Sequence, residues 1–202
     1  MKRPLIAFSG LMLAATLAHG SIFDFVATLD GPSESPANAS PGVGAATFQY
    51  DDVAHTLSID VTFSGLTGNT TASHIHAATT IPGVSTAGVA TQTPSFTGFP
   101  LGVTSGSYSH TFDLTLTSSF NSAYVSAHGG TAAGAEAALF TAMEDGKAYL
   151  NIHTTTFGGG EIRGFLQEVP AVVPEPTTTC VLGAGVLGAF ALARRFRSGS
   201  RK

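Results

Sequence analysis

Strict alternation of apolar and polar side chains is the feature that most limits how this chain can fold. In residues 56–63 an apolar side chain recurs at every second position, at Leu57, Ile59, Val61 and Phe63. A period of two is typical of a strand with one buried face. The pattern also occurs in residues 112–116 and 148–152, and further candidate strands are residues 23–29, 45–50, 73–77, 88–91, 123–127 and 161–167. Because Gly- and Pro-rich turns separate these short segments, we expect an all-β fold, an antiparallel β-sandwich or barrel.

One short helix is expected beside the strands. Residues 135–144 are rich in Ala and contain Leu139, Phe140 and Met143, and Gly146 stands where a C-terminal helix cap belongs. We expect this helix to pack across an end or an edge of the sheet.

The charges of the chain are segregated, and this excludes one class of partner. All thirteen Asp and Glu lie between Asp24 and Glu175, a stretch in which Lys147 and Arg163 are the only basic residues. The middle of the chain therefore carries a net charge of −11. An acidic body repels phosphate backbones, so we expect no binding to nucleic acid. Cations or neutral glycans are more compatible partners.

The first twenty residues have the order of a secretory signal peptide. Two basic residues, Lys2 and Arg3, precede a mostly apolar run at residues 4–17, and Ala18-His19-Gly20 follows as a small-residue cleavage site. These three parts in this order define a signal peptide. We expect residues 1–20 to be removed by a signal peptidase during export.

The C-terminal residues have the order of a second sorting segment. A linker at residues 168–176 ends in Pro174-Glu175-Pro176, residues 177–193 are apolar and uncharged, and residues 194–202 are basic. The apolar run is at the lower limit for a transmembrane helix. The basic cluster, which includes Arg194, Arg195 and Arg197, should act as a stop and form a cytoplasmic tail.

This arrangement resembles a PEP-CTERM sorting signal. The resemblance implies that an exosortase recognises the tripeptide and that the tail is processed in transit, so the membrane helix is a transient anchor. It also implies a Gram-negative host, often one that makes a biofilm, and export across the inner membrane to the cell surface or the extracellular space. The alternative is a plain C-terminal membrane anchor, which also leaves the middle of the chain outside the cytoplasm.

Three histidines project from polar faces of candidate strands. His74 and His76 are two positions apart, so both imidazoles point to the same face of a strand. In residues 149–154 polar and apolar side chains alternate, so His153 projects from the polar face together with Asn151. Imidazole ligands suit copper or zinc. We therefore predict His74, His76 and His153 as candidate metal ligands.

The alternative is that these histidines are hydrogen-bonded residues that bind no metal. His128, which precedes two glycines, is a further candidate ligand. His55 and His110 lie near the ends of candidate strands and are expected to be ordinary solvated residues.

Arg163 is one of two basic residues in the acidic middle, and it shares a strand face with Glu161 two positions earlier. A guanidinium suits a partly buried, bidentate pair with a carboxylate. We expect a structural ion pair of Glu161 and Arg163. The alternative is a site for an anion or a glycan carboxylate.

Three elements in order resemble a CHRD (chordin-type) domain. They are His-Ile-His at residues 74–76, Tyr-Leu-Asn-Ile-His-Thr at residues 149–154 and Gly-Gly-Glu-Ile-Arg-Gly at residues 159–164. Together with residues 29–31 and 34–36, the resemblance covers residues 21–167. It implies an exported module without a settled biochemical activity. The His-x-His strand is also similar, by analogy, to Cu/Zn superoxide dismutases, so an immunoglobulin-like or dismutase-like architecture is expected.

Two functions follow from this sequence. The first is a non-enzymatic module of the cell envelope or extracellular matrix, with a polysaccharide or another envelope component as its partner. The second is a copper or zinc redox protein that resembles superoxide dismutase and uses the three histidines. A purely structural ion is a third reading of the same histidines. No motif indicates a catalytic nucleophile.

Overall fold

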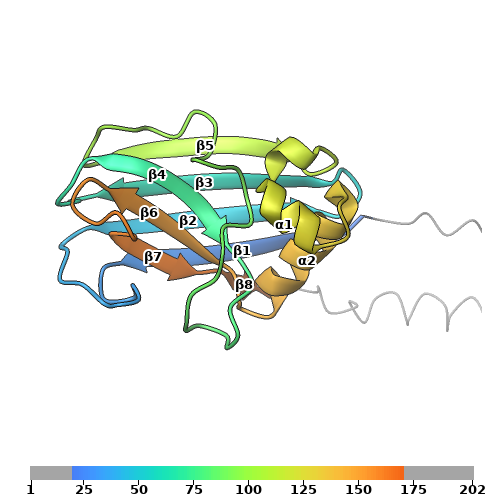
Figure 1. The fold of residues 1–202 in the computed structure, drawn as a ribbon, viewed down its shortest axis with the longest axis horizontal. Coiled ribbons are helices and arrows are strands. Elements are labelled where there is room, and N and C mark those ends of the chain that lie inside the picture. The colour runs from blue at the N-terminus through green and yellow to red at the C-terminus, as the bar shows by residue number, and fades with distance from the viewer. Residues whose placement is uncertain (1–19, 171–202) are drawn as a thin grey trace, which may run out of the picture. The chain divides into compact units, whose positions relative to one another are not determined.

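The computed structural model describes residues 20–170 and contains an antiparallel sheet of eight strands (Figure 1). The strands are β1 (Ile22–Asp30), β2 (Val43–Asp51), β3 (Thr56–Ser64), β4 (Thr70–His76), β5 (Gly106–Asp113), β6 (Tyr149–Thr154), β7 (Ile162–Phe165) and β8 (Gln167–Val169). They follow the order β4-β6-β7-β1-β2-β3-β5, and β8 also pairs with β1. Every pairing is antiparallel, so the predicted antiparallel β fold is confirmed.

The sheet is continuous and curls into a half-barrel, in which β4 and β6 lie in front of β2 and β3 (Figure 1). The predicted sandwich would need two separate sheets, so the barrel alternative is closer to the observed fold. Strand β1 joins the part of the sheet formed by β4, β6 and β7 to the part formed by β2, β3 and β5. There Asp30 pairs with Arg163 of β7, and residues 24–26 pair with β8.

The inner face of the half-barrel holds the hydrophobic core. On β3 the side chains of Leu57, Ile59, Val61 and Phe63 are at most 4% exposed, which confirms the alternation seen in the sequence. The polar residues between them face outward because successive side chains of a strand point to opposite faces.

Within residues 20–170 the structure contains two α-helices, where the sequence predicted one. Helix α2 (Ala132–Glu144) includes the predicted helix and starts earlier, because the Thr131 hydroxyl accepts a hydrogen bond from Gly134 N at 3.1 Å and caps it. Helix α1 (Ser122–Ala127) lies where residues 123–127 were predicted to form a strand. That prediction was wrong because Asn121 Oδ1 accepts from Ala123 N at 2.9 Å and starts a helix.

Two other predicted strands differ in the structure: residues 112–116 belong to β5 only at their first two positions, and residues 88–91 form no continuous strand. Strand β5 ends at Asp113 because its carboxylate accepts a hydrogen bond from Thr115 N at 2.9 Å, which turns the chain. The segment 88–91 forms only isolated bridges, from Val89 to His76 and from Thr91 to Phe120. A short 3-10 helix, η1 (Thr117–Ser119), follows the turn after β5.

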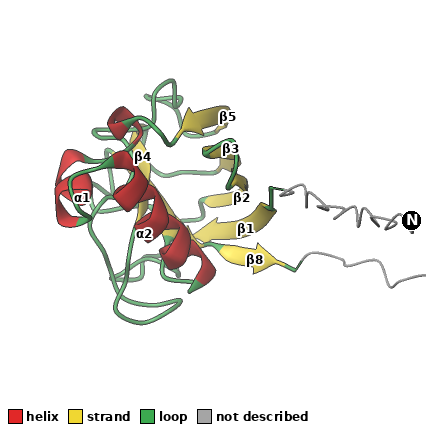
Figure 2. Ribbon diagram, turned by 90° about the vertical axis from the view of Figure 1, so that its right-hand side faces the viewer, coloured by secondary structure: helices red, strands yellow, loops and turns green. Residues whose placement is uncertain are grey.

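Helix α2 packs at one end of the half-barrel (Figure 2). The ring of Phe140 lies 4.4 Å from that of Tyr50 on β2 and 4.7 Å from that of Phe23 on β1. The carboxylate of Glu136 accepts a hydrogen bond from the Tyr50 hydroxyl at 2.9 Å and pairs with His55 Nδ1 at 2.9 Å. The side chain of His55 is 49% exposed, as expected for a solvated residue, but it also pairs with Glu136, which comes from a helix distant in sequence.

Strands β4, β6 and β7 are covered on both faces. Their inner side chains join the core, and two loops lie over the outer side chains: the β1–β2 loop at residues 31–42 and the β4–β5 loop at residues 77–105. The β4–β5 loop also protects the free edge of β4. Its backbone donates to this edge at Ile75 O from Ala90 N at 2.9 Å, and at Ser73 O from Phe96 N at 2.9 Å. The outer face of these strands is consequently enclosed.

The predicted sorting segments lie outside the described residues. These are the signal peptide except its last residue, the tripeptide, the apolar run and the basic tail. Within residues 20–170, no helix has both the length and the hydrophobicity needed to cross a membrane.

Candidate metal centre

Strands β4 and β6 bring three histidines to one place. In their antiparallel register Ala72 pairs with His153 and His74 pairs with Asn151. The alternation of side chains puts His74 and His76 of β4 on the same outer face as His153 of β6. The two strands are far apart in sequence, so this convergence depends on their pairing.

The geometry of the three rings fits a metal ion. One nitrogen from each of His74, His76 and His153 lies within 4.8 Å of the other two. Their ring centres are 4.9, 4.7 and 5.9 Å apart. A tetrahedral ion at about 2.0–2.1 Å from each nitrogen would hold the ring centres roughly 5 Å apart. Small side-chain rotations would therefore bring the three nitrogens to ligand distance.

These nitrogens have no other partner. His74 Nδ1, His76 Nε2 and His153 Nε2 are buried and make no hydrogen bond. Leaving a buried polar atom unpaired costs about 1–3 kcal/mol. Three such atoms side by side indicate a site that is built for a ligand.

Backbone carbonyls fix the orientation of two of the rings. His76 Nδ1 lies 2.8 Å from Ala87 O, and His153 Nδ1 lies 3.0 Å from Gly158 O. A carbonyl only accepts, so in both rings the Nδ1 atom carries the proton and donates it. The lone pair is then on Nε2, the atom that faces the cluster, as metal-bound imidazoles require.

Burial keeps the three imidazoles neutral. Burial, together with the neighbouring His153 and His76, lowers the pKa of His74 to about 3. Burial likewise lowers the pKa of His76 to about 4 and shifts the pKa of His153 downward. At neutral pH the cluster therefore carries no positive charge, and Nε2 of His76 and Nε2 of His153 each offer a free lone pair. Three neutral imidazoles without a thiolate or carboxylate suit copper or zinc.

Arg163 holds the loops that cover this face. Its Nη1 donates to Ser85 O of the β4–β5 loop at 2.8 Å, and its Nε donates to Ser33 O of the β1–β2 loop. Its guanidinium carbon lies 4.8 Å from the ring centre of Tyr149, and that ring stacks on His76 at 4.8 Å and 2°. Arg163 therefore positions both loops and, through Tyr149, the ring of His76.

The structure does not bring Glu161 and Arg163 together as an ion pair. The ion pairs within residues 20–170 are His55–Glu136 and Lys147–Asp145. The carboxylate of Glu161 instead accepts four hydrogen bonds, from the hydroxyls of Ser40 and Thr154, both at 2.6 Å, and from the backbone N–H groups of residues 67 and 68. Residues two apart on a strand are about 6.6 Å from each other, and each of these side chains has nearer partners.

Comparison with known families identifies the relationship. The profile of the CHRD domain matches residues 25–166, which is most of the chain. The chain belongs to the CHRD family. A second profile, the PEP-CTERM protein-sorting motif, matches residues 172–195. No curated protein and no solved structure matches the chain.

Both resemblances inferred from the sequence are thus confirmed. The PEP-CTERM motif implies export across the inner membrane, sorting to the surface and processing by an exosortase-type system. The motif match contains Pro174, Glu175 and Pro176 and the first two arginines of the basic cluster. The exact ends of the signal peptide, linker, apolar run and tail stay predictions.

The residues that carry the CHRD resemblance gather at the candidate metal centre. The His-Ile-His and Tyr-Leu-Asn-Ile-His-Thr elements supply the three histidines, and the Gly-Gly-Glu-Ile-Arg-Gly element supplies Arg163 and Glu161. Gly164, which ends the last element, lies where a Cβ atom would be 2.3 Å from Thr28 O of β1. Only glycine therefore lets β7 approach β1 this closely.

Two further residues of the CHRD domain at this face were not predicted as site residues. Asn151 Nδ2 donates to Glu34 Oε1 at 3.0 Å, and both side chains are buried. Burial raises the pKa of Glu34 to about 7, although Arg163 and the hydrogen bond from Asn151 lower it. The polar face of β6 indicated Asn151, but nothing in the pattern pointed to Glu34, because it reaches the site from a loop.

The other described histidines of the CHRD domain are not part of the cluster. His128 follows α1 and its Nδ1 donates to Tyr124 O at 2.8 Å, so the prediction of a fourth ligand is not supported. His110 lies on β5 with its ring 4.5 Å from that of Phe112.

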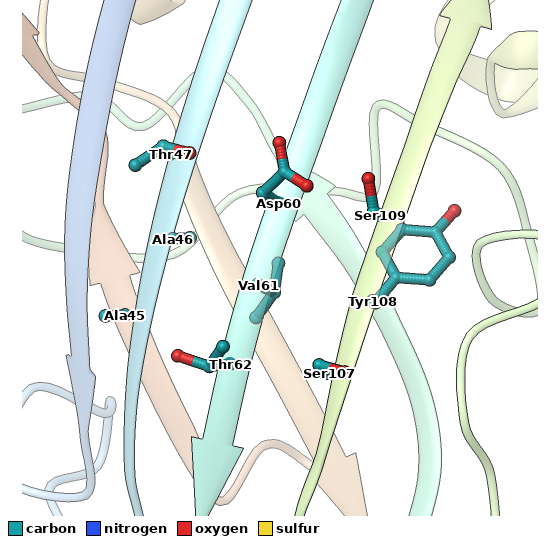
Figure 3. Close-up of a pocket in the computed structure, with 9 residues that line it drawn as sticks. All are labelled: Ala45, Ala46, Thr47, Asp60, Val61, Thr62, Ser107, Tyr108 and Ser109. Atoms are coloured by element: carbon teal, nitrogen blue, oxygen red, sulfur yellow. The ribbon is translucent and has the colours of Figure 1, made fainter.

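The outer face of β2, β3 and β5 is a second, weaker candidate surface (Figure 3). It carries a shallow depression of about 450 Å³ in which Thr47, Asp60 and Ser109 lie side by side on neighbouring strands. The side chains at its rim are small and rich in hydroxyl groups, and Thr62 and Ser107 are exposed. Asp60 is its one charged group, so this surface lacks the convergent polar groups of a specific site.

Proposed function

We propose that this chain is an exported, exosortase-sorted CHRD module that binds one copper or zinc ion at the cell envelope through His74, His76 and His153. The observation that carries the proposal is the set of three buried imidazole nitrogens that face one another without partners. The module acts by binding and not by catalysis.

A metal ion competes with water for this cluster. A water molecule can donate to Nε2 of His76 and Nε2 of His153, and it also satisfies His74 Nδ1 only if that atom carries the proton of its ring. An added proton is also disfavoured, because burial lowers the pKa of each of these histidines. One cation of suitable radius binds all three lone pairs at once.

The place of action supports a binding role. The sorting motif directs the domain to the surface, and the acidic middle of the chain attracts cations. The hydroxyl-rich outer face in Figure 3 is where a neutral polysaccharide of the envelope or matrix would contact the domain. The expected likeness to the architecture of immunoglobulin domains or dismutases stays part of this proposal.

The test is metal titration of residues 21–170, a segment that contains all the described strands and their core. Zn²⁺ and Cu²⁺ are each titrated into the metal-free protein at pH 7, with wild type, His76→Ala and the matched control His110→Ala. We expect one equivalent of metal in the wild type, at least a hundredfold weaker binding in His76→Ala and unchanged binding in His110→Ala. Absence of binding in the wild type, or equal binding in His76→Ala, would overturn the proposal.

The redox alternative is tested on the same material. A superoxide dismutation assay of the copper-loaded domain should give no more activity than the His76→Ala variant or free copper. Activity that requires the intact cluster would instead favour the enzyme.

A further inference from the structure

We infer that the metal centre has a fourth position, next to the three histidines, and that Asn151 Oδ1 holds a water molecule or another small protic ligand there. This inference rests on the proposed function. It makes Asn151 a positioning residue for the ligand that completes the coordination of the metal.

The register places Asn151 beside the histidines. It pairs directly with His74 across β4 and β6, and it lies two positions before His153 on the same face of β6. Cβ atoms of directly paired residues in antiparallel strands are about 4.5–5.5 Å apart. The side chain of Asn151 therefore borders the cluster on two sides.

The hydrogen bonds of Asn151 fix the direction of its amide. Nδ2 donates to Glu34 Oε1 at 3.0 Å and to Glu34 Oε2 at 3.3 Å. Turning the amide over would place Oδ1 against the carboxylate of Glu34, with no hydrogen between the two oxygens whenever that carboxylate is ionised. The carbonyl end is consequently the free end.

That free end is enclosed. Asn151 is 2% exposed, and its Oδ1 is buried without a partner. Gly160 closes the space above it, since a Cβ atom there would lie 2.5 Å from Nδ2 and 2.6 Å from Oδ1. Bulk water is therefore excluded, and the missing donor has to come from within the site.

Four buried side-chain polar atoms lack partners in the part of the chain that the structure describes, and all four are on this face. Three are imidazole lone pairs, which suit a metal ion. The fourth is an amide oxygen, which needs a hydrogen to accept. A metal ion with three histidine ligands commonly carries a water in its fourth position, and such a water satisfies the amide oxygen as well.

The test uses Co²⁺ as a spectroscopic substitute for zinc in residues 21–170, together with Zn²⁺ affinity. The visible bands of Co²⁺ report its coordination number and ligands. Asn151→Ala should weaken Zn²⁺ binding about 10–100-fold and change the Co²⁺ bands, as loss of a group that orients a metal ligand does. The matched control is Ser73→Ala, which removes a 3.0 Å hydrogen bond to Asn151 O from the opposite face of the same strand pair. It should leave affinity and spectrum unchanged.

A second variant keeps the inference testable if Asn151→Ala does not fold. Asn151→Asp retains an oxygen at this position and should tighten Zn²⁺ binding and shift the Co²⁺ bands, because a carboxylate accepts a hydrogen bond from the metal-bound water more strongly than an amide oxygen does. Metal binding with the affinity and spectrum of the wild type in both folded Asn151 variants would overturn this inference and leave the proposed function intact. A wild-type domain that binds neither ion would overturn both.

Discussion

The carboxylate of Glu161 accepts four hydrogen bonds from three separate segments, although the nearby Arg163 was its expected partner. The donors belong to the β1–β2 loop, to the turn between β3 and β4, and to β6. Burial alone would raise the pKa of Glu161, but these hydrogen bonds outweigh it and hold the pKa below its ordinary value of 4.5. Glu161 thus connects the segments that frame the candidate metal centre without using a cation.

Replacing Glu161 with Gln should lower the free energy of unfolding by about 2–3 kcal/mol. The NH₂ group of Gln cannot accept a hydrogen bond, so at least one of the four groups that now donate to the carboxylate would lose its acceptor. Urea denaturation at pH 7 measures this loss. Glu168→Gln, at an exposed position of β8, is the control and should change stability by less than about 0.5 kcal/mol.

The same pair of proteins gives a pH dependence with a definite sign. Because the folded pKa of Glu161 is lower than the unfolded one, its contribution is fully present above about pH 4.5 and is lost as the pH falls through the folded pKa. The stability difference between wild type and Glu161→Gln should therefore shrink on acidification below pH 4.5. A difference that stayed constant down to pH 2 would contradict this role of the carboxylate.

At the scale of elements, helices α1 and α2 are held in place by a close backbone contact. Gly134 lies in the first turn of α2, and a Cβ atom there would be 2.0 Å from His128 O, at the end of α1. The contact allows α2 to follow α1 closely and to bring Glu136 and Phe140 onto the end of the half-barrel. At position 134 this close contact with His128 O outweighs helix propensity and requires glycine.

Gly134→Ala should therefore destabilise the protein by about 1–3 kcal/mol, the usual cost of overpacking, although Ala normally stabilises a helix by about 1 kcal/mol relative to Gly. Thermal and urea unfolding measure the change. Ala137→Gly, at an exposed position of the same helix, should cost only the propensity difference of about 1 kcal/mol. A Gly134→Ala variant more stable than the wild type would show that the two helices can separate without cost.

At the scale of the whole molecule, the acidic CHRD domain and its sorting motif are parts of one export route. The tripeptide Pro174-Glu175-Pro176 lies within the matched sorting motif. Processing should then depend on this tripeptide and not on its neighbours.

Changing Pro174, Glu175 and Pro176 together to Ala should leave the C-terminal tail attached when the chain is expressed in a host that has an exosortase. Intact mass of the protein recovered from the cell surface and the medium measures this. Val172 and Val173 changed to Ala form the control and should be processed like the wild type. Equal processing of the tripeptide variant would argue for a plain membrane anchor.

Much of the fold and part of the site could be predicted from local patterns. The alternation in β3 fixed which of its side chains face the core, and the spacing of His74 and His76 put them on one face, because both depend only on the period of a strand. The same local reasoning failed for residues 123–127, where the Asn121 cap produced a helix, and for the pairing of Glu161 with Arg163.

The sequence by itself determined the strand faces, the acidic middle and the order of the sorting segments, since each is a property of neighbouring residues. Only the tertiary structure decided that His153 meets His74 and His76, that Glu34 reaches Asn151, and that Arg163 holds two loops. These contacts join residues more than seventy positions apart, and they depend on strand register and loop packing, which no local period encodes.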